Sequence, residues 1–215
     1  IAGLGAGLAA VSPAVAQDWG SGNDLVARQP AAIDAALARW ETLQGSRTHM
    51  FADYAGFVLA YPTFPRSEIL RLRAEAALEN EAPSSAEVIR FFDANPPLTN
   101  PGRARYALAL ATMQRPEALA EARKAWRGGQ MADAVELYIA QLYAGQFTSD
   151  DNTVRMDALL WQSKADAAAR HLVNVPEAAR PMALARLSLL RGTRPEAAGV
   201  AVPAGAESDP GYVFN

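Results

Sequence analysis

Acidic residues are the most numerous candidates for chemistry in this sequence, which has 23 Asp and Glu. Two carboxylates can work as general acid and base when one lies in an apolar pocket and the other stays solvated. Asp150 and Asp151 follow Thr148, and a helix start explains this group, because hydroxyls cap helices and acids favour the positive helix end. Glu75 has arginines at helical spacing and is expected to form a solvated ion pair. Three more glutamates share a Pro-Glu-Ala sequence typical of helix starts: Glu117, Glu177 and Glu196.

Histidine and serine chemistry is not indicated. His49 and His171 have no His or Cys at ligand spacing, so each is expected to lie at the surface or at a helix end. The sequence has no G-x-S-x-G elbow, and Glu207-Ser208 falls in a Pro/Gly-rich tail that would not hold a catalytic group. We therefore assign no catalytic, cofactor-binding or metal-binding residue and expect no cofactor.

Six aromatic side chains could form a platform on which sugars stack, but their helical spacing favours core positions. They are Trp40, Trp126, Trp161, Tyr54, Tyr61 and Tyr143.

The elements that position these residues are predicted to be helices. Half of the 215 residues are hydrophobic, and alanine, the best helix former, is common, whereas β-branched residues are sparse. The net charge of −3 provides no basic field for nucleic acid, and the absence of cysteine excludes disulfides and thiolate chemistry. An all-α protein follows.

The clearest local signal is the corner FADYAGFVLAYPTFP at 51–65, where a helix ends in a proline-rich turn and a second helix begins at 66–78. We expect the second helix to pack through Ile69, Leu72, Ala76 and Ala77. Similar helices joined by short turns continue to residue 199. This order predicts a right-handed superhelix (an α-solenoid) of antiparallel helical hairpins, tetratricopeptide-like, over residues 25–199.

The two ends differ in character from this domain. Ile1–Val11 is an apolar run too short to span a bilayer, and SPAVAQ after it has the small residues of a cleavage site, so 1–16 is predicted to be a signal-peptide remnant cleaved after Ala16. An ordinary Ala/Gly-rich terminus is the alternative. Residues 17–24 are expected to be a flexible lead-in and 200–215 an irregular tail leading to a missing C-terminal part. The predicted location is the periplasm.

Several segments resemble the N-terminal superhelical region of soluble lytic murein transglycosylases. They are FADYAGFVLAYPTFP with SEILRLRAEAAL, FFDANPPLTNPGRARYALAL, ARKAWRGGQ and, less closely, SDDNTVRMDALLWQ. They run in family order from about Trp40 to Trp161, although the family often has a histidine where this chain has Asn152.

The resemblance implies a scaffold whose partners are peptidoglycan glycan strands and its own C-terminal catalytic domain, with no nucleic acid and no transmembrane span. In that family a lysozyme-like C-terminal domain cleaves the MurNAc-GlcNAc bond and leaves a 1,6-anhydro product. The Glu-Ser helix and the Gly-Leu-Met-Gln segment of that domain do not occur here, so the resemblance transfers no catalytic residue. The alternative is a stand-alone tetratricopeptide-like module that binds a protein partner in the periplasm.

Overall fold

The computed structural model describes residues 22–215, with side chains from residue 32 onward. Two compact units divide the chain, residues 1–42 and 43–215, and each is described by itself. The predicted signal-peptide remnant at 1–16 lies outside the described residues. In the first unit the described backbone is helical from the start of α1 (Gly22–Gly45), which begins three residues before the expected Leu25 and continues through Pro30. Pro30 therefore does not interrupt the helix.

Helices make up the second unit, and the part of the chain that the structure describes has no strand, which confirms the all-α fold class. The helices are α2 (Phe51–Ala60), α3 (Ser67–Ala77), α4 (Ser85–Ala94), α5 (Asn100–Thr112), α6 (Ala118–Arg127), α7 (Asp133–Leu142), α8 (Ser149–Trp161), α9 (Ala165–His171), α10 (Arg180–Leu190) and α11 (Pro210–Phe214). Short 3-10 turns η1 (Leu172–Asn174), η2 (Glu196–Ala198) and η3 (Ala206–Ser208) connect the last of them.

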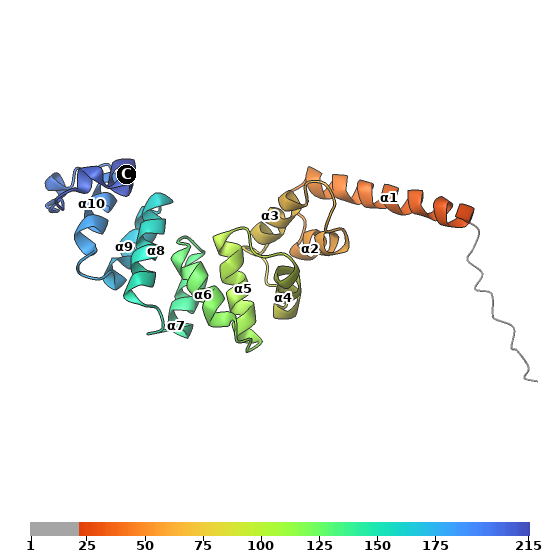
Figure 1. Ribbon diagram of the computed structural model, residues 1–215, viewed down its shortest axis with the longest axis horizontal. Coiled ribbons are helices and arrows are strands. Elements are labelled where there is room, and N and C mark those ends of the chain that lie inside the picture. Colours follow the sequence, from red (N-terminus) through yellow and green to blue (C-terminus); the bar gives the residue numbers. More distant parts are fainter. Residues whose placement is uncertain (1–21) are drawn as a thin grey trace, which may run out of the picture. The chain divides into compact units, whose positions relative to one another are not determined.

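Most helices of this unit pack against the next helix in the sequence or against the one after it. Helix α2 packs on α3, α4 on α5, and α5 on α6, while α2 also contacts α4 and α3 contacts α5 (Figure 1). Two apolar clusters fill the C-terminal half, one between α5, α6 and α7 around Trp126 and Ile139, and one between α8, α9 and α10 around Leu159 and Leu187. Packing between successive elements therefore builds the core.

The corner between α2 and α3 forms as predicted. Helix α2 ends at Ala60, with Tyr61 as its C-cap, and the turn closes at Arg66, whose φ of 58° is left-handed. Phe57 packs against the rings of Tyr61 and Phe64 at 4.9 and 5.3 Å. The corner is thus an aromatic turn that directs α3 back onto α2.

The buried face of α3 is not the predicted one. Leu70, Ala74, Glu75 and Leu78 are buried, whereas Leu72 is 41% exposed. The hydrophobic pattern misplaced the face because a carboxylate, Glu75, occupies one of its inner positions. An apolar pattern cannot reveal a buried acid.

The C-terminal tail is folded rather than irregular. Asp209 caps α11 by accepting a hydrogen bond from Tyr212 N at 2.8 Å, and Pro210 occupies the first turn, where proline is tolerated. The Asn215 side chain donates to Leu160 O at 3.0 Å and accepts from Arg186 Nε at 2.8 Å. Proline and glycine thus begin a short helix here, and side-chain hydrogen bonds fasten it to α8 and α10.

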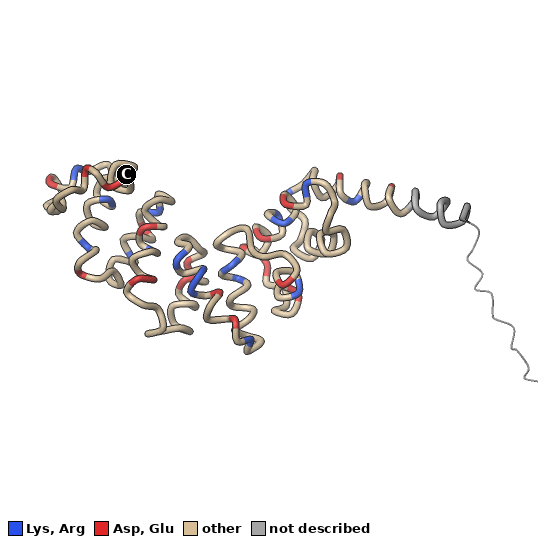
Figure 2. The backbone as a smooth tube through the Cα atoms, in the orientation of Figure 1, with Lys and Arg blue, Asp and Glu red and all other residues tan. Residues whose placement is uncertain are grey.

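Charged residues of both signs are interspersed along the helices (Figure 2). Among residues 22–215, no helix combines the length and the apolar character that crossing a membrane requires.

Candidate functional site

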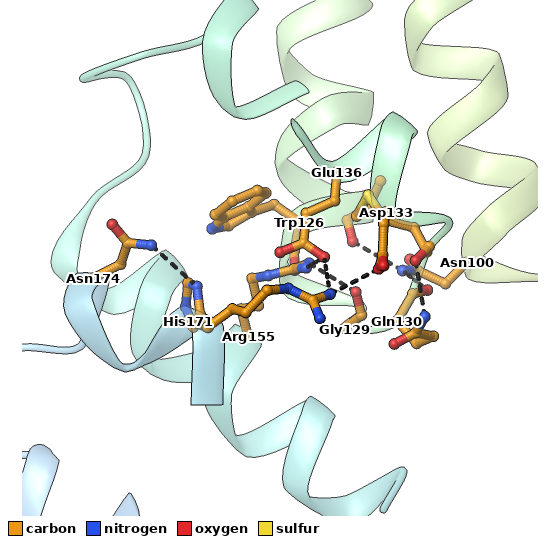
Figure 3. A network of polar contacts seen from close by, with 12 residues as sticks. Asn100, Trp126, Gly129, Gln130, Asp133, Glu136, Arg155, His171 and Asn174 are labelled. Atoms are coloured by element: carbon orange, nitrogen blue, oxygen red, sulfur yellow. Dashed lines mark hydrogen bonds and ion pairs between the residues drawn. The ribbon is translucent and has the colours of Figure 1, made fainter. Parts of the chain in front are cut away.

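The best-developed polar site lies around the turn that follows α6, Arg127-Gly128-Gly129-Gln130. Helix α6 leaves backbone carbonyls unpaired at its C-terminal end, and such groups need partners when they are enclosed. Gly129 follows the helix with a left-handed φ of 87°, the conformation in which many helices end at a glycine. Side chains from α5, from α8 and from the residue after α8 supply the partners, and we call this arrangement the clamp (Figure 3).

Arg155 of α8 is the centre of the clamp and is fully buried. Its Nη1 donates to Trp126 O at 3.1 Å and to Gly129 O at 2.7 Å, and its guanidinium lies over the Trp126 ring, 4.2 Å from the centroid. Its Nη2 lies 3.0 Å from Glu136 Oε2 of α7, an ion pair without hydrogen-bond alignment. Burial lowers the pKa of Arg155, and Glu136 opposes this shift. An arginine stays charged even so, and its carbonyl and carboxylate partners compensate the buried charge.

Asn100 and Gln162 complete the clamp from either side. Asn100 Nδ2 donates to Ala125 O at 3.0 Å and to Gln130 O at 2.9 Å. Gln162 Nε2 donates to Gly128 O at 2.9 Å, while its Oε1 accepts from Gln130 N at 2.8 Å. Three side chains, from the start of α5, from α8 and from the residue after α8, thus bind five backbone carbonyls, those of Ala125, Trp126, Gly128, Gly129 and Gln130.

Both glycines of the turn are required by these side chains. A Cβ at Gly128 would lie 2.0 Å from Asn100 Oδ1, and a Cβ at Gly129 would lie 2.6 Å from Gln162 Oε1. Contacts this short exclude a side chain unless the clamp opens. The Gly-Gly pair therefore serves close approach as well as chain reversal.

Trp126 joins the clamp to His171. Its indole stacks on Phe147 at 4.6 Å, its Nε1 donates to Asn152 Oδ1 at 3.0 Å, and its edge meets the His171 ring at 5.5 Å. His171 Nε2 lies 2.9 Å from the Asn152 carbonyl, which fixes this nitrogen as the donor, and Asn174 Nδ2 approaches Nδ1 at 3.4 Å. Burial lowers the pKa of His171 to about 4, so the ring is neutral at pH 7. His171 is at a helix end, as expected, but it is not at the surface.

Asp150 and Asp151 take the helix-start role that was predicted for them. Asp151 forms a capping box with Thr148, through Asp151 N to Oγ1 at 3.1 Å and Thr148 N to Oδ2 at 2.9 Å. Burial opposes ionisation of Asp151, but the hydrogen bonds from Thr148 and Arg127 outweigh it and lower the pKa. Arg127 Nη1 also pairs with Asp150 at 2.7 Å. Asp151 is therefore held ionised as a structural anion, and Asp150 adds an ion pair with Arg127 at the helix start.

Glu75 contradicts its predicted role as a solvated ion pair. Only 2% of it is exposed, and its carboxylate accepts from Leu98 N at 2.8 Å, Thr99 N at 2.7 Å and Thr99 Oγ1 at 2.6 Å. These donors precede Asn100, the first residue of α5, so the carboxylate lies where the helix dipole favours an anion. Glu75 joins α3 to the start of α5.

The remaining sequence candidates stay apart from the clamp. The Pro-Glu-Ala glutamates and the Glu207-Ser208 pair are exposed: Glu117, Glu177, Glu196, Glu207 and Ser208. His49 stacks edge-on with Tyr54 at 5.8 Å. The predicted core position is confirmed for Trp126, Tyr54 and Tyr143, whereas Tyr61 and Trp161 are 41% and 42% exposed and Trp40 is half-buried.

Beside Trp126 the surface is hollowed, with a cavity of about 370 Å³ between the ends of α6 and α7, the start of α8 and η1. Tyr143, Phe147, Asn152 and Asn174 line it, and exposed Ala144 and Gly145 lie at its rim. We call this cavity the hollow. It is the part of the site where a ligand could be received, because the clamp itself is closed.

The arrangement positions backbone and binds charge rather than performing acid–base chemistry. Within residues 32–215 no three His, Asp or Glu side chains gather in a way that could hold a metal ion. The sequence analysis named Trp126 and Asp151 as candidates, but not Arg155, Asn100 or Gln162. The one signal in the sequence that could have found them is that each lies in a segment quoted above for its resemblance to a known family.

Comparison with family models, with curated proteins and with solved structures found no match to this chain.

Proposed function

We propose that this chain is the N-terminal superhelical scaffold of a periplasmic lytic transglycosylase. In this role it presents peptidoglycan glycan strands to a lysozyme-like catalytic domain, which cleaves the MurNAc-GlcNAc bond and leaves a 1,6-anhydro end. The glycan strand is the ligand and the chemistry belongs to the catalytic domain.

The proposal rests on where three of the segments that resemble lytic murein transglycosylases lie in the fold. ARKAWRGGQ contributes Trp126 and the Gly-Gly turn, SDDNTVRMDALLWQ contributes Arg155 and Gln162, and FFDANPPLTNPGRARYALAL contributes Asn100. Three segments that are separate in sequence thus meet in one hydrogen-bonded site. A chance likeness between helical hairpins would match alanines and leucines at repeating positions rather than the polar partners of one turn.

The succession of helix pairs supports the scaffold role. Helices that contact their neighbours and next neighbours are the arrangement from which superhelical repeats are built. Such repeats offer long surfaces suited to extended ligands such as a glycan strand.

Sedimentation with purified, insoluble murein sacculi tests the proposal. We expect the 215-residue chain to pellet with sacculi and not with cellulose, and to leave a murein zymogram uncleared. A chain that stays in the supernatant at micromolar sacculus concentration, or that clears the gel, would overturn the scaffold role.

A protein-binding module is the second candidate, and one observation favours it. Helix α7 carries Leu137, Tyr138 and Leu142 with exposed fractions of 59%, 53% and 41%. Exposed apolar side chains that gather on one helix are typical of partner surfaces. Reading the gene beyond codon 215 separates the candidates, since a lysozyme-like domain with Glu-Ser and Gly-Leu-Met-Gln segments supports the scaffold and a stop codon supports the module.

A further inference from the structure

The hollow beside Trp126 differs from the other surface cavities of this unit in its charge. Its lining has no charged side chain. The cavity near α9 is lined by Asp133, Lys164, Asp166 and Arg170, and the one at the start of α5 by Asp93, Arg103, Glu121 and Lys124. A neutral lining suits a neutral ligand, because an ion bound there would lose its hydration without gaining a counter-charge.

The polar groups of the hollow include donors and acceptors that the described residues leave unused. Asn152 uses Oδ1 to accept from Trp126, and its Nδ2 donates to no other described residue. Asn174 uses Nδ2 toward His171, and no described residue donates to its Oδ1. The hollow therefore offers one amide donor and one amide acceptor, which is the complement of an acetamido group with its C=O and N–H.

Tyr143 adds a third polar group. The residue is only 7% exposed, and its hydroxyl has no hydrogen-bond partner among the described residues. Burial raises its pKa, which keeps the hydroxyl neutral. Phe147 contributes an aromatic surface beside it, with 6.3 Å between the two ring centroids. An aromatic ring with hydroxyl and amide groups around it suits the apolar face and polar edge of a sugar.

We infer that the hollow is a subsite for an N-acetylated sugar ring of the N-acetylglucosamine type, with Asn152, Asn174 and Tyr143 as its polar contacts. This inference rests on the proposed function and names where on the scaffold a glycan strand is held. The volume of about 370 Å³ lies within the usual range of small-ligand sites, about 300–1,000 Å³. Asn152 donates to the acetamido carbonyl and Asn174 accepts from its N–H.

Titration of the ¹⁵N-labelled chain with tri-N-acetylchitotriose tests the subsite, and cellotriose, which lacks acetamido groups, is the matched sugar. We expect the side-chain NH₂ signals of Asn152 and Asn174 to shift with chitotriose and not with cellotriose. Asn152→Asp removes the donor and keeps the acceptor for Trp126, so the indole N–H signal of Trp126 reports that the fold is intact. We expect this variant to weaken chitotriose binding about tenfold, and Tyr143→Phe to weaken it several-fold.

Asn80→Asp in an exposed loop and Tyr138→Phe on the exposed side of α7 are the matched controls, and both should bind like the unmodified chain. The inference is overturned if millimolar chitotriose shifts neither amide, if cellotriose shifts them equally, or if Asn152→Asp binds chitotriose unchanged. Sacculus sedimentation separates this failure from that of the proposed function. A chain that pellets with sacculi but ignores chitotriose refutes the subsite alone, whereas a chain that binds chitotriose but does not pellet supports the subsite and refutes the scaffold role.

Discussion

Replacing Glu75 by Gln tests whether a single buried carboxylate holds the start of α5 in place. Three donors converge on it, Leu98 N, Thr99 N and Thr99 Oγ1, at 2.6–2.8 Å. If the Gln oxygen takes the position of Oε2, it keeps the two Thr99 bonds and turns its NH₂ toward Leu98 N, so that two donors face each other. Leaving a buried donor unpaired costs about 1–3 kcal/mol, and loss of the charge weakens the bonds that remain. We expect the free energy of unfolding to fall by about 2–3 kcal/mol.

Urea-induced unfolding followed by far-UV circular dichroism measures this difference. The midpoint should fall while the slope m stays constant, because the same surface is exposed on unfolding. Glu79→Gln, an exposed acid just after α3, is the matched control and should change stability by less than about 0.5 kcal/mol.

A double-mutant cycle of Glu75→Gln with Thr99→Val measures how much of the stability loss comes from the hydrogen bond between these two side chains. The Thr99 hydroxyl donates to Glu75 and accepts from Gly102 N at 3.0 Å, so the two substitutions should couple by about 0.5 kcal/mol or more. The reasoning is refuted if Glu75→Gln matches Glu79→Gln in stability, or if the cycle is strictly additive.

Three further perturbations address the clamp and its neighbour. His171 has a pKa of about 4 in the folded state and 6.5 in the unfolded state, so the unfolded state binds the proton first and the free energy of unfolding should fall by about 3 kcal/mol as the pH drops from above 6.5 to 4. Chemical unfolding at pH 7.0, 5.5 and 4.5 should show a smaller loss of stability in His171→Asn than in the unmodified chain. Equal losses in the two would disprove the lowered pKa of His171. Gly128→Ala places a methyl group 2.0 Å from Asn100 Oδ1 and should lower the free energy of unfolding by about 2 kcal/mol in the same assay. Gly56→Ala, which has open space around it inside α2, is the control and should be neutral or stabilise the chain by about 0.5–1 kcal/mol. Similar effects of the two substitutions would contradict the steric explanation. Arg155→Lys keeps the charge but lacks the planar guanidinium that bridges two carbonyls and covers Trp126. We therefore expect the free energy of unfolding to fall by about 3 kcal/mol, measured by thermal unfolding. An unchanged melting temperature would show that Arg155 does not hold the clamp together.

Local signals were readable in the sequence because their two halves lie within a few residues. The Thr148–Asp151 and Ser84–Glu87 capping boxes each join residues three positions apart, and the structure contains both, with Thr148 beginning a helix as predicted. The left-handed glycine after α6 and the aromatic corner at 51–65 belong to the same class of short-range signal. The alanine-rich composition sufficed for the fold class.

Contacts between distant residues were not readable. The partners of Glu75 lie 23 and 24 residues away, and the carbonyl partners of Arg155 lie 26 and 29 residues away, in α6 and in the turn that follows it. A charged residue with no partner nearby in the sequence is expected on the surface. For this reason Glu75 was predicted to be solvated, and Arg155 was not recognised as a buried residue. Tyr138 and Leu142 are the reverse case, because their helical spacing is typical of a core face and yet both side chains are exposed on α7. Only the fold decides which of two apolar faces is covered.

The clamp also determines which segment of this protein could be exchanged as a unit. Hairpin repeats are commonly lengthened, shortened or exchanged one pair at a time, because each pair contacts only its neighbours. Here the turn after α6 takes its hydrogen bonds from Asn100 at the start of α5 and from Arg155 and Gln162 in and after α8. A chimera that cuts between these positions would separate carbonyls from their donors. The shortest segment that could be transplanted with this site whole therefore runs from residue 100 to residue 162, and recombination should be tolerated outside it rather than within.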